Sequence, residues 1–292
     1  FNKINDTIIC EKYEVKAKEI KNNQIKKEKD FDLNNLIKKN QFHFHKETEH
    51  FVKNLNKFDL NTSISITRKV HGSSHISSYV LINKNLKWYE KFLLKLKLDI
   101  NKYEYGFIWS SGKPRSKKPK GITSETNNWN NINQSFYSED IWLKAHNLLK
   151  NKLEKGITIY AELTGKGIQG ENYTYNKDFA IDVYRITFTN EDGIVLEFNW
   201  NQVKKYCELY DLNYVKEYFI GTVKDLVQDK NELLKFLQDK YLNKSYPDCK
   251  IDEGICIRID ETNEIFKLKS PNFILMESKQ QEQEITNIED DN

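Results

Sequence analysis

The sequence predicts an α+β fold whose sheets are mainly antiparallel. Apolar and polar residues alternate in several β-rich segments, as expected of strands, while other segments repeat their apolar residues at helical spacing. A turn cluster from Asn190 to Gly193 separates two of the β-rich runs, which indicates a hairpin of antiparallel strands. Hairpins interspersed with helices are typical of the α+β class.

The individual elements follow from the same periodicities. The expected strands are residues 61–69, 75–82, 157–163, 181–189, 194–198, 254–259 and 264–269. The expected helices are residues 85–98, 138–154, 199–210 and 223–242. Ser138 is followed by two acids, Glu139 and Asp140, so we expect it to cap the start of the second helix.

Length and charge limit the possible partners. A chain of 292 residues with 38% hydrophobic residues can bury a real core, in one large domain or two smaller ones. The net charge is only +3, so affinity for a polyanion needs a local basic patch. Segment 112–120 is such a patch, and it is either a solvated loop or a phosphate-contacting loop. Its cations are Lys113, Arg115, Lys117, Lys118 and Lys120.

Three segments divide the chain. Residues 1–41 include a stretch rich in Lys, Asn and Gln and are expected to form a linker, whereas residues 42–276 are expected to fold as the main domain. Residues 277–292 carry six acids against one lysine and are expected to be disordered. The chain begins at Phe1 without a methionine, so we expect a fragment or a processed product.

Neither the cysteines nor the histidines form a metal-type cluster. The four cysteines lack paired metal spacing, and a chain of this size needs no disulfide, so a reducing cytoplasm is the simple inference. Three histidines near the start of the main domain are expected to pack or cap, because no cysteine or acid pair completes a ligand set. The cysteines are Cys10, Cys207, Cys249 and Cys256, and the histidines are His43, His45 and His50. The sequence also contains no apolar run or leader typical of a membrane span or a signal peptide.

Four charged positions interrupt otherwise apolar strands. Lys69 ends the polar face of the first expected strand, and Glu162 ends the polar face of the strand that begins at residue 157. Glu253 opens the strand 254–259, and Lys267 and Lys269 project together from the last strand. Each position alone fits the solvent-facing side of a sheet, but together these are the groups that nucleotidyl transfer requires.

The chemistry of that transfer explains the residue types. A lysine that attacks an α-phosphate must be a neutral amine, although its ordinary pKa is about 10.4. Two neighbouring lysines or a bound metal are expected to lower the pKa of Lys69 while they neutralise phosphate charge. Carboxylates such as Glu162 and Glu253 suit Mg²⁺ or ribose hydroxyls. Gly72 is expected to let the backbone turn close to the nucleotide, where a side chain would collide.

With these residues in order, the sequence resembles the covalent nucleotidyltransferase superfamily of polynucleotide ligases and capping enzymes. The similar motifs are "KVHGSS" from residue 69, "YAELTG" from 160, "EGICIR" from 253 and "KLK" from 267. The resemblance covers about residues 42–276, and the joint pattern is much more specific than any one motif. It implies a nucleotidyltransferase (ATP-grasp-like) fold, that of a ligase adenylation domain.

His71 gives the resemblance a direction. DNA ligases and capping enzymes usually have aspartate at this position, whereas a histidine here is similar to the motif of RNA ligases. The neighbouring sequence segments most resemble RNA ligases of the bacterial and phage type, which have an amino-terminal OB module ahead of the transferase domain. Since "IICEKYEV" (residues 8–15) is loosely similar to the boundary in that type, residues 1–41 are expected to include a remnant of an upstream OB module.

The resemblance implies a role for each motif residue. Lys69 would form the lysyl-adenylate, and Glu162 would contact the ribose. Glu253, with Glu162, would bind the catalytic metal, Mg²⁺ or Mn²⁺. Lys267 and Lys269 would hold the ATP phosphates as catalytic cations. His71 and Gly72 would shape the nucleophile loop.

Two further roles stay open. The resemblance places an aromatic that stacks on adenine at Tyr184, followed by Arg185 where related ligases often have aspartate. Phe179 is the alternative stacker, and a buried strand tyrosine explains Tyr184 nearly as well. The usual Ser-Arg motif is replaced by "WSSGKPR", so its arginine is supplied by Arg115 or Lys113, or is absent.

Together these expectations describe an ATP-dependent RNA ligase. It would seal RNA 3′-hydroxyl and 5′-phosphate ends through lysyl-AMP on Lys69 and an adenylylated RNA end, as a cytoplasmic monomer. Loop 112–120 would grip the RNA backbone. The alternatives are a GTP-dependent mRNA capping guanylyltransferase and a catalytically silent RNA-binding relative. Whether the RNA is a nicked duplex, a broken tRNA or a free single strand stays open.

Overall fold

The computed structural model describes residues 36–45, 47–111, 139–169, 178–247, 249 and 251–279. It adds three two-residue strand backbones, β1 (Lys3–Ile4), β2 (Thr7–Ile8) and β7 (Thr123–Ser124). The chain divides into two compact units, Phe1–Phe31 and Asp32–Asn292. In the first unit, β1 and β2 pair antiparallel. The predicted RNA-gripping loop, with Lys113, Arg115, Lys117 and Lys118, lies outside the described residues.

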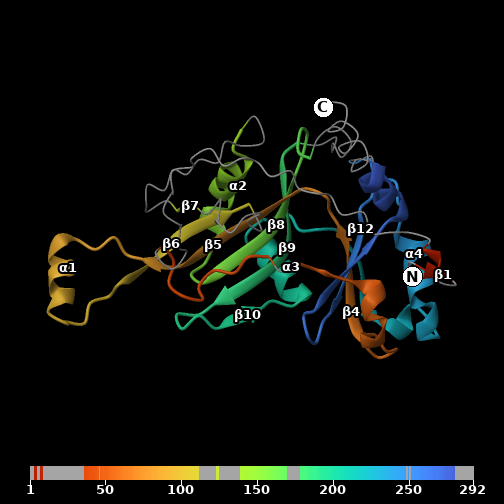
Figure 1. Cartoon of the computed structure of the whole chain (residues 1–292), viewed down its shortest axis with the longest axis horizontal. Helices are drawn as coiled ribbons and strands as arrows, with labels where there is room; N and C mark the ends of the chain where they lie inside the picture. Colours follow the sequence, from red (N-terminus) through yellow and green to blue (C-terminus); the bar gives the residue numbers. More distant parts are fainter. Residues whose placement is uncertain are drawn as a thin grey trace. The chain divides into compact units, whose positions relative to one another are not determined.

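Two sheets form the framework of the second unit (Figure 1). A six-stranded sheet has the order β10-β9-β8-β5-β6-β7, and a five-stranded sheet has the order β11-β4-β12-β13-β3. Their strands are β3 (Glu49–His50), β4 (Ser63–Lys69), β5 (Ser73–Asn83), β6 (Tyr103–Ser110), β8 (Ile157–Thr164), β9 (Ala180–Thr189), β10 (Val195–Glu197), β11 (Glu217–Thr222), β12 (Gly254–Ile259) and β13 (Ile265–Lys269). Neighbouring strands pair antiparallel except β3 with β13, which confirms the predicted α+β class.

Short helices connect and cover these strands. The α-helices are α1 (Trp88–Lys95), α2 (Ile141–Leu149), α3 (Trp200–Leu209) and α4 (Leu233–Tyr241), and the 3₁₀ turns are η2 (Phe51–Lys57), η3 (Lys150–Lys152), η5 (Val223–Asp225) and η6 (Lys230–Glu232). The Asp140 carboxylate accepts from the backbone N–H groups of Trp142 and Leu143 and caps α2, whereas the predicted cap, Ser138, lies outside the described residues. A single helix over 223–242 is also wrong, because Asp225 and Asp229 accept backbone N–H groups and close two separate 3₁₀ turns before α4.

Besides the two-residue strands β1, β2, β3 and β7, the longer strands β6 and β11 were not predicted. β6 pairs along its length with β5, although its sequence "YEYGFIWS" does not alternate cleanly. Gly106 interrupts that pattern because the Ile82 side chain fills the space that a Cβ at Gly106 would occupy. β11 lies at the edge of the five-stranded sheet beside β4, so its residues "EYFIGT" are only partly buried and give no strong apolar signal.

Each sheet buries one face in its own core. In the five-stranded sheet, Ile64 and Ile66 of β4 lie beside Ile255 and Ile257 of β12, and α4 packs against them with Leu237. These residues share the apolar face that the alternation predicted, so the opposite face carries Lys69 and its polar neighbours. The burial of the isoleucines therefore fixes the direction of the polar side chains.

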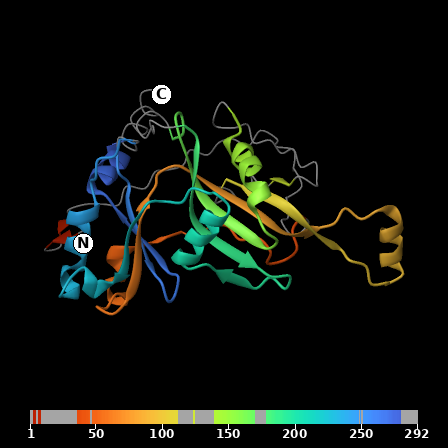
Figure 2. The ribbon, with the colours of Figure 1, turned by 180° about the vertical axis from the view of Figure 1, so that it is seen from behind.

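The six-stranded sheet repeats this division. Ile157, Ile159 and Ala161 of β8 pack with Trp200 and Val203 of α3, which covers this face of the sheet (Figure 2).

At the chain end, residues 271–279 are helical, so the first three residues of the predicted disordered tail continue a helix. None of the helices in the described part of the chain combines the length and apolarity that a bilayer crossing requires.

Gly254 should tolerate alanine poorly. It has φ +130°, and a Cβ would meet the Leu268 carbonyl oxygen at 2.2 Å, so β12 and β13 would have to separate. We expect Gly254→Ala to reduce the free energy of unfolding by about 3 kcal/mol, measured by urea denaturation. Gly167 is the control, since it also has positive φ (+86°) but nothing lies within 4 Å of a Cβ. Gly167→Ala should cost about 1 kcal/mol, and equal losses would contradict the packing argument.

Candidate active site

The five-stranded sheet brings the predicted lysines onto one face. Lys69 of β4 lies opposite Gly254 of β12, which in turn lies opposite Lys269 of β13. Two residues further along β12, Cys256 lies opposite Lys267 of β13. Cross-strand partners point to the same side of a sheet, so residues far apart in sequence form one polar floor.

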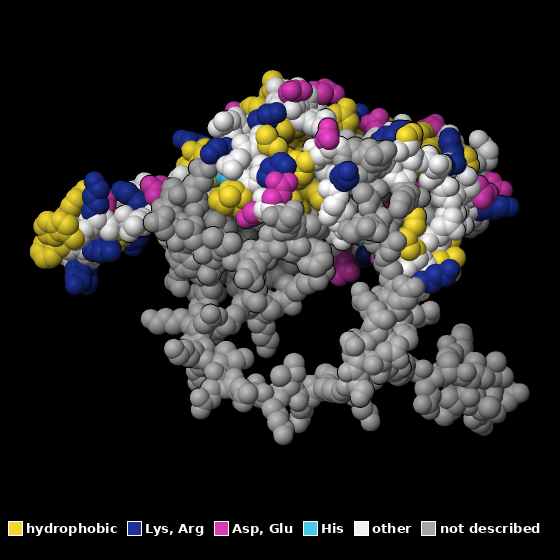
Figure 3. Space-filling model, turned by 90° about the horizontal axis from the view of Figure 1, so that it is seen from above, with side chains coloured by type: hydrophobic (Ala, Val, Ile, Leu, Met, Phe, Trp, Pro, Cys, Tyr) yellow, Lys and Arg dark blue, Asp and Glu magenta, His cyan; other side chains and the backbone are white. Residues whose placement is uncertain are grey.

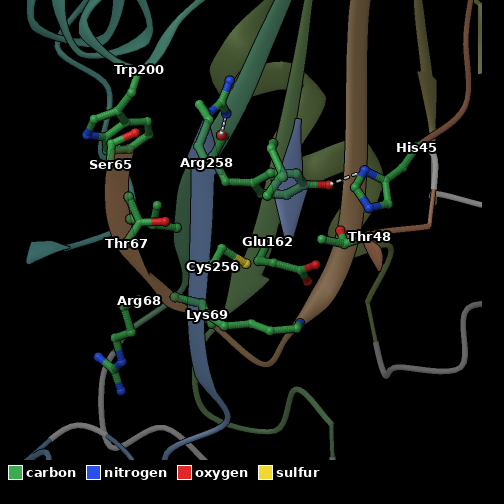
Figure 4. Close-up of a pocket in the computed structure, with 14 residues that line it drawn as sticks. His45, Thr48, Ser65, Thr67, Arg68, Lys69, Glu162, Trp200, Cys256 and Arg258 are labelled. Carbon is green, nitrogen blue, oxygen red and sulfur yellow. Dashed lines mark hydrogen bonds between the residues drawn. The ribbon is translucent and has the colours of Figure 1, made fainter. Parts of the chain in front are cut away.

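The six-stranded sheet contributes the other side of a pocket over this floor. Glu162 comes from the end of β8 and Tyr184 from β9, and both line the pocket with Lys69. Figure 4 shows the Lys69 and Glu162 side chains extending toward the same space, with His45 facing them. The pocket therefore lies between the polar faces of two sheets whose other faces are buried.

An ion pair between Lys69 and Glu253 dominates the electrostatics. Lys69 Nζ lies 2.8 Å from Glu253 Oε1, and His71 Nδ1 lies 3.4 Å from Glu253 Oε2. The Glu253 side chain is only 5% exposed. Burial opposes its charge, yet the Lys69 ammonium and His71 lower the pKa of Glu253 below its ordinary value.

The same pair corrects the predicted state of the nucleophile. Burial would favour a neutral Lys69, but the Glu253 carboxylate beside it outweighs burial and raises the pKa of Lys69. The two neighbouring lysines do not lower this pKa as predicted, because acids lie beside them. Lys267 Nζ is 3.7 Å from Glu47, and Lys269 Nζ is 2.7 Å from Glu277. Lys69 is therefore an ammonium in the ligand-free protein.

Glu162 has the opposite tendency. Burial is the largest influence, and it outweighs the Lys69 ammonium; together with the nearby Glu253 and Asp182 carboxylates it raises the pKa of Glu162 to about 8. Its Oε2 atom is buried and accepts no hydrogen bond from the described residues. At neutral pH Glu162 thus carries a proton, and its unsatisfied oxygen can receive a ligand hydroxyl or a cation.

Two carboxylates at this place fit a divalent cation. Mg²⁺ is typically held by one or two carboxylates together with water and substrate phosphates, so a third protein ligand is not needed. Within the described residues, no group of three or more His, Cys, Asp or Glu is arranged to hold a metal ion. Glu253 and Glu162 could therefore hold a metal only together with the phosphates of a bound nucleotide.

The structure gives Gly72 a packing reason in addition to the predicted one. A Cβ at Gly72 would lie 2.4 Å from the Leu163 carbonyl oxygen, which belongs to the neighbouring β8 strand. The glycine is needed because the chain entering β5 passes close to β8, while its approach to a nucleotide stays a prediction. Gln169 Nε2 also donates to the Gly72 carbonyl at 2.8 Å. His71 packs edge-on against Phe273 and reaches Glu253, so it orients the carboxylate.

Of the two aromatic residues predicted to stack on adenine, one lines the pocket and the other does not. Tyr184 lines the pocket, and its hydroxyl lies 3.3 Å from His45 Nδ1; burial raises the pKa of Tyr184. Phe179 packs with Leu163 in a different cluster, so the alternative stacker does not line the pocket. Arg185 also points elsewhere, because its guanidinium forms two 2.6 Å hydrogen bonds with Glu197.

Arg258 is a pocket residue that the sequence analysis missed. It is 5% exposed and donates to the carbonyls of Phe198 at 3.1 Å and Tyr184 at 3.2 Å. The signal was present, since Arg258 has the same strand parity as Gly254 and Cys256. His45 also lines the pocket, although the sequence marked it only as one of three clustered histidines. His43, another of the three, lies 3.0 Å from the Asn40 carbonyl oxygen.

The comparisons with known proteins give a fold. No protein-family model matches the chain, and no curated protein matches it. A substituted form of Naegleria gruberi RNA ligase with ATP and Mn has 10% identity and a TM-score of 0.51, over 81% of this chain and 58% of that one. The same ligase with PPi has 10% identity and a TM-score of 0.47, over 82% and 59% of the two chains. Another substituted form, without ligand, has 11% identity and a TM-score of 0.49, over 79% and 57%.

These structures are longer than the present chain, which spans a little under three fifths of their length. At such low identity the likeness concerns the path of the backbone, and the match with a TM-score above 0.5 is the one that carries weight. The chain therefore has the nucleotidyltransferase fold of an RNA ligase structure, as the motif order predicted.

Proposed function

We propose that this chain is an ATP-dependent RNA ligase that acts through lysyl-AMP on Lys69. One observation carries the proposal. Lys69 and Glu162 line one pocket, Glu253 lies 2.8 Å from Lys69 Nζ, and Lys267 and Lys269 project from the same sheet face as Lys69, within a ligase fold. A lysine nucleophile, two acids and two further cations are the set that nucleotidyl transfer needs.

The first step requires Lys69 to lose its proton. Glu253 Oε1, at 2.8 Å, holds this proton on Lys69, so the ammonium would lose it to solvent only when the ion pair is weakened. The neutral Nζ then attacks the α-phosphorus of ATP, so that a P–N bond forms and the bond to pyrophosphate breaks. Lys267 and Lys269 exchange their carboxylate partners for phosphate oxygens as the charge develops.

A divalent cation, Mg²⁺ or Mn²⁺, on Glu253 and Glu162 would neutralise phosphate charge and weaken the hold of Glu253 on the Lys69 ammonium. His71 keeps Glu253 in place, and Tyr184 is the aromatic that faces the pocket from β9. In the later steps the AMP moves from Lys69 to an RNA 5′-phosphate, and an RNA 3′-hydroxyl displaces it. The fold likeness to RNA ligase structures supports RNA as the substrate.

Covalent labelling tests the proposal directly. Incubation with a divalent cation and α-labelled ATP should leave label on the wild-type chain, and Lys69→Ala should remove it, because the attacking amine is gone. Lys240→Ala, an exposed lysine of α4, is the control and should label normally. Label from GTP alone would favour the capping alternative. Label from neither nucleotide would overturn the ligase and leave a silent RNA-binding relative.

Glu162→Gln should change how stability depends on pH. The folded protein raises the pKa of Glu162 from 4.5 to about 8, so folding becomes less favourable as the pH rises between those values. The neutral glutamine lacks this dependence. In ligand-free protein we expect Glu162→Gln to gain stability relative to wild type from pH 5 to pH 8, on the order of a few kcal/mol by denaturant titration. The exposed Glu139→Gln is the control, and a pH-independent difference for Glu162→Gln would contradict the assignment.

Glu277→Gln should strengthen ATP binding. The Glu277 carboxylate occupies Lys269 in the ligand-free protein, so ATP phosphates compete with it. A partly exposed ion pair contributes roughly 0.2–1 kcal/mol, so the KM for ATP in self-labelling should fall about one-and-a-half- to fivefold. The maximal rate of self-labelling on Lys69 should stay similar to that of the wild type. A higher KM would show that Glu277 helps to position Lys269 and does not compete with the nucleotide.

A further inference from the structure

A separate arm leaves the six-stranded sheet between β5 and β6. It comprises residues 84–102, and the Lys84 N–H donates to the Lys102 carbonyl at its base. Figures 1 and 2 both show α1 at the tip of this arm, projecting away from the sheets. An extension that holds its own helix outside the core is placed to contact something other than the core.

The helix is held by an acid that is turned inward. Glu90, the single acid of α1, receives the Lys87 N–H at 2.7 Å and the Lys84 ammonium at 2.6 Å. These contacts cap the helix and lower the pKa of Glu90. Because the Glu90 side chain is largely buried, its charge is withdrawn from the outer surface of the arm.

Apolar side chains occupy the outer surface. Trp88 is 82% exposed, and Phe92 and Leu96 are each 56% exposed. Their spacing of four residues places them along one side of the helix, and the lysines at 87, 91 and 95 follow the same spacing one position earlier. Figure 3 shows hydrophobic side chains gathered at the end of the arm with lysines around them. Exposed aromatics of this kind mark an interaction surface.

The charge of the arm points to an anionic partner. Residues 84–102 contain six lysines and two acids, a net charge of +4, whereas the whole chain carries only +3. The remaining residues therefore sum to −1, and the arm is a concentrated positive extension on a nearly neutral chain. The active-site lysines, in contrast, have carboxylates beside them.

We infer that this arm binds single-stranded RNA, with bases stacked on Trp88 and Phe92 and phosphates contacted by Lys91 and Lys95. Aromatic faces beside lysines are the means by which proteins hold single strands without reading sequence. Lysine ammonium groups are point charges suited to phosphates, and any base can stack on an aromatic ring. This inference rests on the proposed function only for the choice of RNA as the polyanion.

Fluorescence anisotropy with a labelled single-stranded RNA of mixed sequence tests the arm. We expect Trp88→Ala/Phe92→Ala to weaken binding roughly thirtyfold or more, since both rings lose a stacked base. Lys91→Ala/Lys95→Ala should also weaken binding, and should reduce the slope of log K against log salt by about 1.4. Leu209→Ala is the matched control, because Leu209 is an apolar residue of α3 that is 74% exposed.

Self-labelling with ATP separates this inference from the proposed function. The arm variants should label at the wild-type rate, since none of the four substituted residues lines the pocket. Loss of RNA affinity in the arm variants supports the arm even if the wild type never labels. Unchanged RNA affinity in both double variants overturns it even if labelling is normal. Unchanged RNA affinity with lost binding to vesicles containing anionic phosphatidylserine would assign the arm to a membrane surface and overturn the RNA inference.

Discussion

The buried ion pair between Lys69 and Glu253 is the interaction on which the rest of the site depends. Two charges at 2.8 Å, one of them on a side chain that is 5% exposed, stabilise each other only while both remain. The pair holds Lys69 as an ammonium in the ligand-free protein. In the proposed mechanism, a ligand that draws Glu253 away from Lys69 would also release the amine.

Strand geometry puts these two residues side by side. Gly254 lies opposite Lys69 in the β4–β12 ladder, and Glu253 precedes it at the start of β12. The positive φ of Gly254 lets the strand approach Leu268 of β13 closely, so a residue with a side chain would displace the carboxylate as well as the strand. The polar floor therefore depends on a backbone position that carries no functional group.

The arm and the pocket distribute charge in opposite ways. In the pocket each lysine of the floor lies near a carboxylate, which keeps a buried and partly dry region close to neutral. On the arm the acid of α1 is buried, while exposed lysines and aromatics remain at the surface. If the proposed function and the proposed role of the arm both hold, nucleotide chemistry and RNA binding occupy different elements, and one can change without altering the other.

The strand faces, the order of the motifs and the likeness in fold follow from the sequence alone, because alternation and short motifs are local properties. The sequence also placed Lys69, Glu162, Glu253, Lys267 and Lys269 on polar positions, which the sheets then brought together. It missed β6 and β11, since Gly106 breaks one pattern and partial burial weakens the other.

The protonation state of the charged groups depends on contacts that form only when the sheets assemble. The pKa of Lys69 depends on Glu253, which lies 184 positions away, and the partners of Lys267 and Lys269 are acids that no motif includes. The role of Gly72 likewise depends on Leu163 of a neighbouring strand, and the pocket position of Arg258 on how two sheets face each other. Electrostatic energies and close packing depend on distance in space, which local sequence patterns do not contain.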